Sequence, residues 1–187
     1  MIAAAEAAAG IYGVWLLARR QKRGLDFLDD SVRGFWQSFW AAPIVLPGML
    51  LLRVLDGSLA LDDGRLRPLA VQLIAYVIQW TAFPLVVSGI VESMGRGHRY
   101  LRYVVAYNWS AVVQMAVFLP VAITAHLFPA REIVLITMAV TVLLLAYQAY
   151  IAHTALEAPL LPSVALVLLD MLIGGLIDKV TERLAAG

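Results

Sequence analysis

Long apolar segments separated by short polar joints dominate the pattern of hydrophobic and polar residues in this chain. Five such segments occupy residues 35–55, 68–91, 103–128, 132–153 and 160–178. A helix rises about 1.5 Å per residue, so about 20 apolar residues cross the ~30 Å hydrocarbon core of a bilayer. The pattern therefore predicts an all-α fold, a polytopic bundle of about five transmembrane helices formed by residues 34–187.

The N-terminal segment, residues 1–33, differs from the apolar segments because alanine supplies most of its apolar character. A basic cluster follows the alanine-rich stretch: Arg19, Arg20, Lys22 and Arg23. A cleaved signal peptide carries its positive charge before the apolar region, so cleavage is not expected. Two interpretations remain, a sixth, short span or a helix lying in the membrane interface. Alanine contributes little to insertion, and Gly10 and Gly13 weaken the helix, which favours an interfacial amphipathic helix.

Prolines and capping residues predict where helices begin and bend. Ser31 is placed to cap the first apolar segment, which contains Pro43 and Pro47. Pro129 follows the third segment after a very short joint, so the third and fourth helices are expected to form an antiparallel hairpin. The fifth helix is expected to end near Asp178, where a polar tail begins.

The distribution of Lys and Arg predicts the orientation in the membrane. Five spans place the two ends of the chain on opposite sides, and the heaviest basic cluster precedes the first span. Basic residues concentrate on the cytoplasmic side of membrane proteins. We therefore expect a multi-pass protein of the cell membrane, a bacterial inner membrane, with its N-terminal segment in the cytoplasm.

Composition narrows the class of protein further. Apolar residues make up 62% of the 187 residues and charged residues 14%, whereas soluble domains average about 45–50% and about 25%. A net charge of +1 argues against a nucleic-acid partner. The chain contains no cysteine, which excludes disulfides, thiol nucleophiles and cysteine metal sites.

The sequence carries none of the short motifs that mark a catalytic site, such as G-x-S-x-G, H-E-x-x-H or a phosphate-binding glycine loop. We therefore expect no enzymatic activity and no cofactor. The aspartates at 56, 62 and 63 lack the spacing of a calcium loop. His153 and Glu157 share a helical face but lack a third ligand, so no metal site is expected either.

Four polar side chains within the apolar segments are the candidate functional residues. They are Gln79, Asn108, Gln114 and Asp170, and the second to fifth segments contain no Lys or Arg that could pair with Asp170. Polar groups at this depth are costly and usually face another helix or a cavity. Asp170 is therefore either a structural tie, hydrogen-bonded to an amide such as Gln114 or Asn108, or part of a proton or cation site between helices.

Asp170, Gly174 and Asp178 recur every four residues and so share one face of the fifth helix. Gly174 is expected to permit close approach of another helix on this face. Asp178 stands beside Lys179 at the end of the apolar segment, and is expected to be solvated near the water boundary.

A basic collar precedes the third apolar segment and consists of Arg96, His98, Arg99 and Arg102. Together with the N-terminal basic cluster, it is expected to form a cytoplasmic basic rim. Such a rim attracts anionic lipid headgroups by about 1 kcal/mol per charge. The expected partners are therefore membrane lipids, with a second copy of the chain or another membrane protein as further partners.

Residues 99–115, RYLRYVVAYNWSAVVQM, open the third of five segments that follow an N-terminal cytoplasmic segment. In this phrase and this topology the chain resembles the bacterial branch of the Yip membrane-protein family over about residues 35–184. The D-L-Y-G-P signature of the eukaryotic relatives, which interact with Rab-type GTPases, is absent. The resemblance implies a helical integral membrane protein with a role in membrane organisation.

Two functions from different classes fit these observations. The first is a non-enzymatic membrane protein that organises lipids or partner proteins through the N-terminal segment and the basic rim. The alternative is a small oligomeric transporter or ion-coupled carrier, with the polar side chains of the second, third and fifth segments lining a site near the middle of the bilayer.

Overall fold

The computed structural model describes residues 4–59 and 66–186. Within these ranges every regular element is helical, which confirms the predicted all-α fold. The elements are α1 (Ala4–Ala18), η1 (Lys22–Phe27), α2 (Val32–Ser38), α3 (Ala41–Leu55), α4 (Leu66–Ser93), η2 (Gly97–Arg99), α5 (Tyr100–Leu127), α6 (Arg131–Leu156) and α7 (Leu160–Ala186).

Five helical segments of the described chain are long and apolar enough to cross a membrane, as the sequence predicts. Their bounds are Val32–Leu55, Arg67–Ser93, Gly97–Leu127, Arg131–Leu156 and Leu160–Leu184. The short helix α1 is apolar but is not one of them. The chain is thus a multi-pass membrane helix bundle preceded by a short N-terminal helix.

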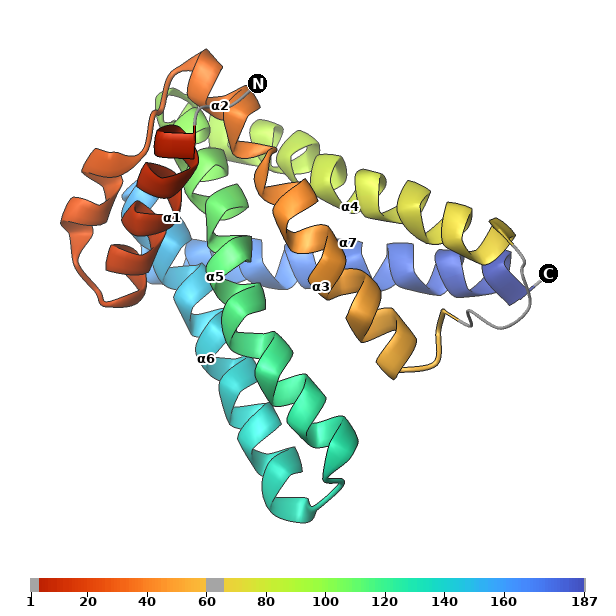
Figure 1. Ribbon diagram of the computed structural model, residues 1–187. Coiled ribbons are helices and arrows are strands. Elements are labelled where there is room, and N and C mark those ends of the chain that lie inside the picture. The colour runs from red at the N-terminus through yellow and green to blue at the C-terminus, as the bar shows by residue number, and fades with distance from the viewer. Residues whose placement is uncertain (1–3, 60–65, 187) are drawn as a thin grey trace.

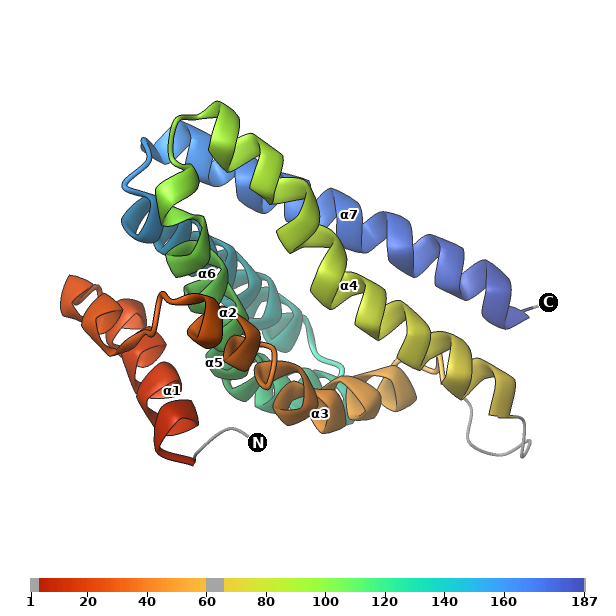
Figure 2. The ribbon, with the colours of Figure 1, turned by 90° about the horizontal axis from the view of Figure 1, so that it is seen from above.

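The long helices form two antiparallel pairs that diverge from a common end (Figures 1 and 2). Helices α5 and α6 form the expected hairpin, while α4 packs along α7. Helix α3 packs on α5 and lies in the fork between the two pairs. The N-terminal segment, η2 and the α6–α7 connection all lie at the common end, whereas the α5–α6 turn and the C-terminal end of α7 lie at the far ends.

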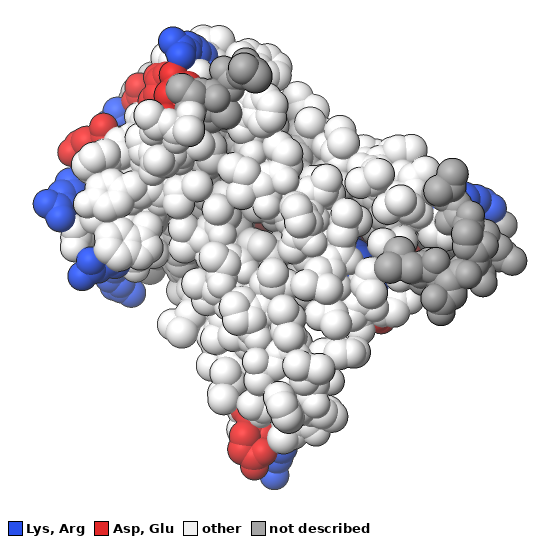
Figure 3. Space-filling model, in the orientation of Figure 1, with Lys and Arg blue, Asp and Glu red and all other residues white. Residues whose placement is uncertain are grey.

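The tightly packed core lies at the common end. Most of its members come from the late part of α4, the early part of α5 and the late part of α6, and include Val87, Tyr103, Ala106, Ile151 and Ala155. Away from this end large aliphatic side chains are exposed, such as Leu143 (67%) and Leu172 (71%). Figure 3 shows most Lys, Arg, Asp and Glu gathered at the extremities, with only small charged areas on the surface between them on this face. This distribution is the one that a lipid environment stabilises.

The first apolar segment forms two helices rather than one continuous helix. The chain breaks between α2 and α3 at Phe39 and Trp40. Pro43 has no N–H to bond the carbonyl of Phe39, which instead accepts from Ala42 N at 3.0 Å. The N-terminal end of α2 agrees with the sequence, because Ser31 Oγ accepts from Gly34 N at 3.1 Å.

The fifth helix continues well beyond its predicted end. The sequence predicts an end near Asp178, but α7 continues to Ala186. The reason is physical: a polar side chain ends an apolar run without ending a helix, and no Gly or Pro occurs between these two residues. The length of the apolar run predicts the length of the membrane span, but it does not predict where the helix ends.

Helix α1 is docked on the common end by close backbone contacts. A Cβ atom on Gly10 would lie 2.7 Å from the Trp109 ring, and one on Gly13 would lie 2.6 Å from the carbonyl oxygen of Gly24. Tyr147 Oη on α6 donates to the carbonyl oxygen of Val14 at 2.7 Å. The glycines that weaken α1 as an isolated helix are therefore the residues that let it pack against η1 and α5.

Candidate functional site

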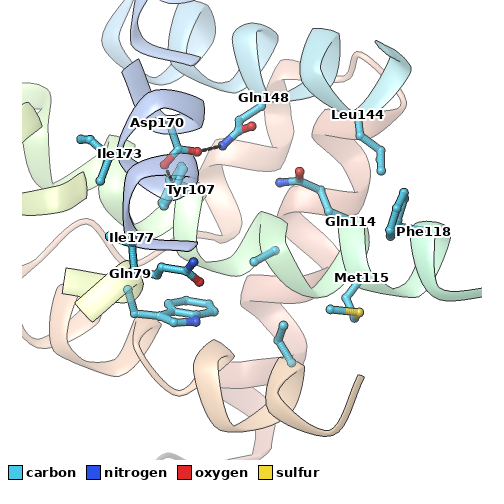
Figure 4. A pocket seen from close by; sticks show the side chains of 14 residues that line it. Gln79, Tyr107, Gln114, Met115, Phe118, Leu144, Gln148, Asp170, Ile173 and Ile177 are labelled. Atoms are coloured by element: carbon cyan, nitrogen blue, oxygen red, sulfur yellow. Dashed lines mark hydrogen bonds between the residues drawn. The ribbon is translucent and has the colours of Figure 1, made fainter. Parts of the chain in front are cut away.

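A cavity of about 420 Å³ lies in the fork between the two helix pairs. All five long helical segments line it, from Val45 on α3 to Ile177 on α7. Its polar side chains are Gln79, Tyr107, Gln114, Gln148 and Asp170 (Figure 4). The structure thus brings Gln79, Gln114 and Asp170 to one site, as the sequence interpretation of a mid-bilayer polar site requires.

Asn108 does not belong to this cavity. Its side chain is fully buried at the common end, where Nδ2 donates to Ser38 Oγ at 2.8 Å. It faces α2, on another side of α5 from the cavity-lining residues Tyr107 and Gln114. The placement of Asn108 in the mid-bilayer site is therefore corrected to a structural tie between α5 and α2.

Asp170 is hydrogen-bonded, but not to the predicted amides. Tyr107 Oη donates to Oδ1 at 2.8 Å, and Gln148 Nε2 donates to Oδ2 at 2.8 Å (Figure 4). Gln114 instead donates to Ser110 Oγ at 3.0 Å, one turn back on its own helix. The carboxylate of α7 is thus held by both helices of the α5–α6 hairpin.

Tyr107 and Gln148 are site residues that the sequence interpretation missed. A signal for Tyr107 was present, because residues 107, 111, 114, 115 and 118 all line the cavity and recur at helical spacing. Once Gln114 is placed in the site, Tyr107 lies seven residues earlier on the same face. Gln148 carried no comparable signal, because it lies near the end of its helix rather than its middle.

The C-terminal half of α7 carries a second polar contact. Gln79 Nε2 donates to Asp178 Oδ1 at 3.1 Å, and the guanidinium of Arg53 on α3 forms an ion pair with the same oxygen. Asp178 is therefore bonded to side chains of α3 and α4 and is also partly solvated, since 38% of its side chain remains exposed. Asp178 joins three helices at the edge of the cavity.

The expected close helix contact at Gly174 is wrong. A Cβ atom added to Gly174 would meet nothing within 4 Å, and the residue lines the cavity instead. Because Gly174 and Asp170 share a face of α7, the small residue widens the cavity beside the carboxylate. Asp170 is the only Asp, Glu, Lys, Arg or His side chain among the lining residues that the structure describes.

The basic collar makes internal contacts at the common end. Arg96 donates to the carbonyl oxygens of Leu156, at 2.7 Å, and Glu157. Arg99 pairs with the carboxylate of Glu157, and this hydrogen bond holds the pKa of Glu157 below its ordinary value. The collar therefore fastens the start of α5 to the end of α6, where Glu157 adopts a left-handed backbone conformation.

Arg102 completes the internal contacts of the collar. Its Nε donates to Asp30 Oδ2 at 3.1 Å, joining α5 to the connection before α2. Nearby, the Ser31 N–H donates to Asp29 Oδ1 at 3.0 Å, and the bonds from Ser31 lower the pKa of Asp29. All three collar arginines thus have protein partners.

The N-terminal basic cluster contrasts with the collar. Arg19, Arg20, Lys22 and Arg23 are all exposed, and no ion pair joins any of them to a described carboxylate. Arg19 lies over the Trp15 ring at 4.8 Å, and Arg20 lies 6.0 Å from the Tyr150 ring. These four cations leave their charge available at the surface of the common end.

Exposed aromatic side chains stand beside this cluster. Tyr12 and Trp15 on α1 and Phe27 on η1 are 44%, 42% and 44% exposed. Tyr12 packs against the other two rings, with centroid distances of 5.9 Å to Trp15 and 5.0 Å to Phe27. We refer to these three rings and the four cations together as the α1–η1 surface.

Among the described residues no group of three or more His, Cys, Asp or Glu side chains could hold a metal ion. His153 and Glu157 do not come together as ligands, since His153 Nδ1 lies 2.6 Å from the carbonyl oxygen of Ala158 and Glu157 pairs with Arg99. Asp62 and Asp63 lie outside the described residues.

Comparisons with protein-family models, with curated proteins and with solved structures each gave no match for this chain.

Proposed function

We propose that this chain is a non-enzymatic membrane protein that gathers anionic lipids at one face of a cell membrane. The observation that carries the proposal is the α1–η1 surface, where four cations that pair with no described carboxylate stand beside three exposed aromatic rings. Aromatic side chains favour the headgroup level of a bilayer, and exposed cations attract anionic headgroups.

The magnitude of the attraction supports this assignment. Each Lys or Arg near an anionic surface contributes about 1 kcal/mol, so a cluster of four concentrates anionic lipid strongly at low salt. The collar arginines are already bonded to Glu157, Asp30 and backbone carbonyls. We therefore assign headgroup binding to Arg19, Arg20, Lys22 and Arg23, and a structural role to Arg96, Arg99 and Arg102.

The proposed orientation follows from the same cluster. Because cytoplasmic leaflets carry the anionic lipids and cytoplasmic segments carry the excess of Lys and Arg, the common end faces the cytoplasm of a bacterial inner membrane in this proposal. The resemblance of residues 99–115 to bacterial Yip-type proteins supports a role in membrane organisation. A second copy of the chain or another membrane protein is a further proposed partner.

The proposal is tested by counting retained lipids on the purified full chain. Native mass spectrometry after extraction from membranes containing phosphatidylglycerol compares wild type with a variant in which the four cluster residues are replaced by Gln. The proposal predicts fewer retained anionic lipids in the variant and an unchanged number of zwitterionic lipids.

A matched control is available at the far ends of the bundle. Arg67, Arg131, Lys179 and Arg183 are also exposed, and replacing them with Gln removes the same formal charge. This control should retain more anionic lipid than the cluster variant. Equal retention of anionic lipid by wild type and the cluster variant would contradict the proposal.

The cavity favours a second candidate function, an ion-coupled carrier that works as an oligomer. Its support is the convergence of Gln79, Gln114 and Asp170 on one polar cavity between membrane-spanning helices. This function predicts pH-dependent flux in proteoliposomes that disappears in Asp170→Asn. Unchanged flux in that variant excludes it.

A further inference from the structure

Each glutamine that lines the cavity uses its amide N–H group on a protein acceptor. Gln148 donates to Asp170, Gln79 donates to Asp178, and Gln114 donates to Ser110. A glutamine amide offers donors on nitrogen and an acceptor on oxygen. The three side-chain carbonyl oxygens accept no hydrogen bond within the part of the chain that the structure describes.

The hydrogen-bond pattern fixes the orientation of these amides. Asp170 and Asp178 accept through carboxylate oxygens, so the amide nitrogens of Gln148 and Gln79 must face them. Ser110 Oγ donates its single hydrogen to the carbonyl oxygen of Tyr107 at 2.7 Å. It therefore accepts from Gln114 Nε2, which leaves Gln114 Oε1 as a free acceptor.

Asp170 adds further acceptor capacity and a formal negative charge. Its two oxygens each receive one hydrogen bond, whereas an ionised carboxylate has about four acceptor positions. No Lys, Arg or His occurs among the described residues that line the cavity to balance this charge. The polar part of the cavity thus presents acceptors to a ligand, next to one carboxylate.

The remaining wall of the cavity is apolar and includes Val45, Trp80, Phe118, Leu144, Ile173 and Ile177. A volume of about 420 Å³ greatly exceeds that of a bare ion, and it falls within the range of about 300–1,000 Å³ found for small-molecule sites. An inorganic cation would satisfy the acceptors but leave the apolar wall without a contact.

From these features we infer that the cavity binds a small organic amine, with its ammonium group at Asp170 and the free glutamine oxygens, and its apolar body against the aliphatic and aromatic wall. An ammonium group supplies three donors and the balancing charge. The inference concerns binding alone. It uses none of the α1–η1 surface, and it holds whether or not the ligand is transported.

Thermal unfolding of the full chain in mild detergent tests the inference with two matched probes, phenethylamine and 2-phenylethanol. A ligand that binds the folded state raises the unfolding midpoint in a saturable way. We expect such a rise with the amine and not with the alcohol, which shares the aromatic body and partitions into the same micelles. An equal effect of both probes, or no saturable effect of the amine, overturns the inference.

Variants locate the binding at the proposed residues. Asp170→Asn should weaken amine binding about tenfold or more, because it removes a charged acceptor. Glu182→Gln is the control, since this exposed carboxylate lies further along the same helix and does not line the cavity. Equal loss of binding in both variants, or in neither, contradicts the assignment.

Gln114→Met gives an independent test if Asp170→Asn does not fold. It removes a free oxygen acceptor at similar volume and should weaken amine binding severalfold. Unchanged amine binding in this variant contradicts the proposed role of the glutamine oxygens. If sodium chloride alone produces the same saturable rise of the unfolding midpoint, the site binds an inorganic cation and the inference of an organic amine is overturned.

Discussion

Tyr107 on α5 donates its hydroxyl hydrogen to Asp170 on α7 over 2.8 Å, and Gln148 on α6 bonds the other oxygen of the same carboxylate at the same distance. One side chain of α7 thus holds both helices of the α5–α6 hairpin. Since the two helix pairs diverge from the common end, this contact joins them beside the cavity that separates them (Figures 1 and 4).

The hydrogen bond from Tyr107 predicts a measurable loss of stability. Tyr107→Phe should lower the free energy of unfolding in detergent by about 1 kcal/mol, the usual range for hydrogen bonds in membrane proteins being about 0.6–2 kcal/mol. Tyr12→Phe is the control, because Tyr12 is 44% exposed and loss of its hydroxyl should cost little. In an Asp170→Asn background the cost of Tyr107→Phe should become smaller. If Tyr107→Phe lowers the stability equally in both backgrounds, the hydroxyl of Tyr107 does not stabilise the fold through Asp170.

The contact between α1 and η1 predicts strong sensitivity at Gly24. A Cβ atom there would collide with the carbonyl oxygen of Gly13, which is backbone and cannot move aside. Gly24→Ala should therefore release η1 from α1, seen as faster proteolysis after Arg20 or Lys22 and as reduced retention of anionic lipid. Gly89→Ala, with nothing within 4 Å of its Cβ position, should be neutral or stabilising by up to ~1 kcal/mol. Equal behaviour of the two variants would contradict the packing.

The pairing of Glu157 with Arg99 predicts a dependence of stability on pH. Its pKa lies below the ordinary value of 4.5 in the folded chain, so the pair stabilises the fold above that pH and the contribution is lost as pH falls through the lowered pKa. Glu157→Gln should therefore lower the unfolding midpoint at pH 7, and the difference from wild type should shrink as the pH falls below 4.5. Glu182→Gln, at an exposed position of α7, serves as the control. A difference that is constant with pH would contradict the assignment.

The ion pair between Arg53 and Asp178 predicts non-additive substitutions. Both side chains are partly buried, so the pair is screened less than an exposed one, and each single substitution, Arg53→Met or Asp178→Leu, should cost about 1–3 kcal/mol. Each single substitution leaves the charge of the other residue unpaired, whereas the double substitution removes both charges. The double substitution should therefore cost less than the sum of the two single costs. Additive costs in a double-mutant cycle measured by unfolding in detergent would show that the two residues do not interact.

The sequence predicts the helices well because membrane burial requires long apolar runs, which are visible residue by residue. It also predicts the Ser31 cap and the α5–α6 hairpin, since both depend on local chemistry. The break at Phe39 follows from Pro43, yet proline alone does not say whether a membrane helix bends or stops. The continuation of α7 past Asp178 was missed because hydropathy measures burial rather than helix length.

The hydrogen-bond partners of the candidate residues depend on how each helix is rotated about its axis. The hydropathy pattern of a single sequence does not determine this rotation. Gln114 and Asp170 line one cavity as expected, but the bonds to Asp170 come from Tyr107 and Gln148. The collar shows the same limit, because the carboxylate that pairs with Arg99 lies 58 residues further along the chain, at Glu157. Charge alone predicted lipid contacts there, and only the fold distinguishes a paired arginine from a free one.

The central claim is that five helices cross the membrane, with the common end on one side and the far ends on the other. Because the chain has no cysteine, single introduced cysteines at Lys22, His98, Pro129 and Lys179 can each be labelled with a membrane-impermeant maleimide in sealed vesicles. Labelling of Lys22→Cys and His98→Cys from one side only, and of Pro129→Cys and Lys179→Cys from the opposite side only, is the predicted result. Labelling of all four from the same side would contradict the five-span arrangement.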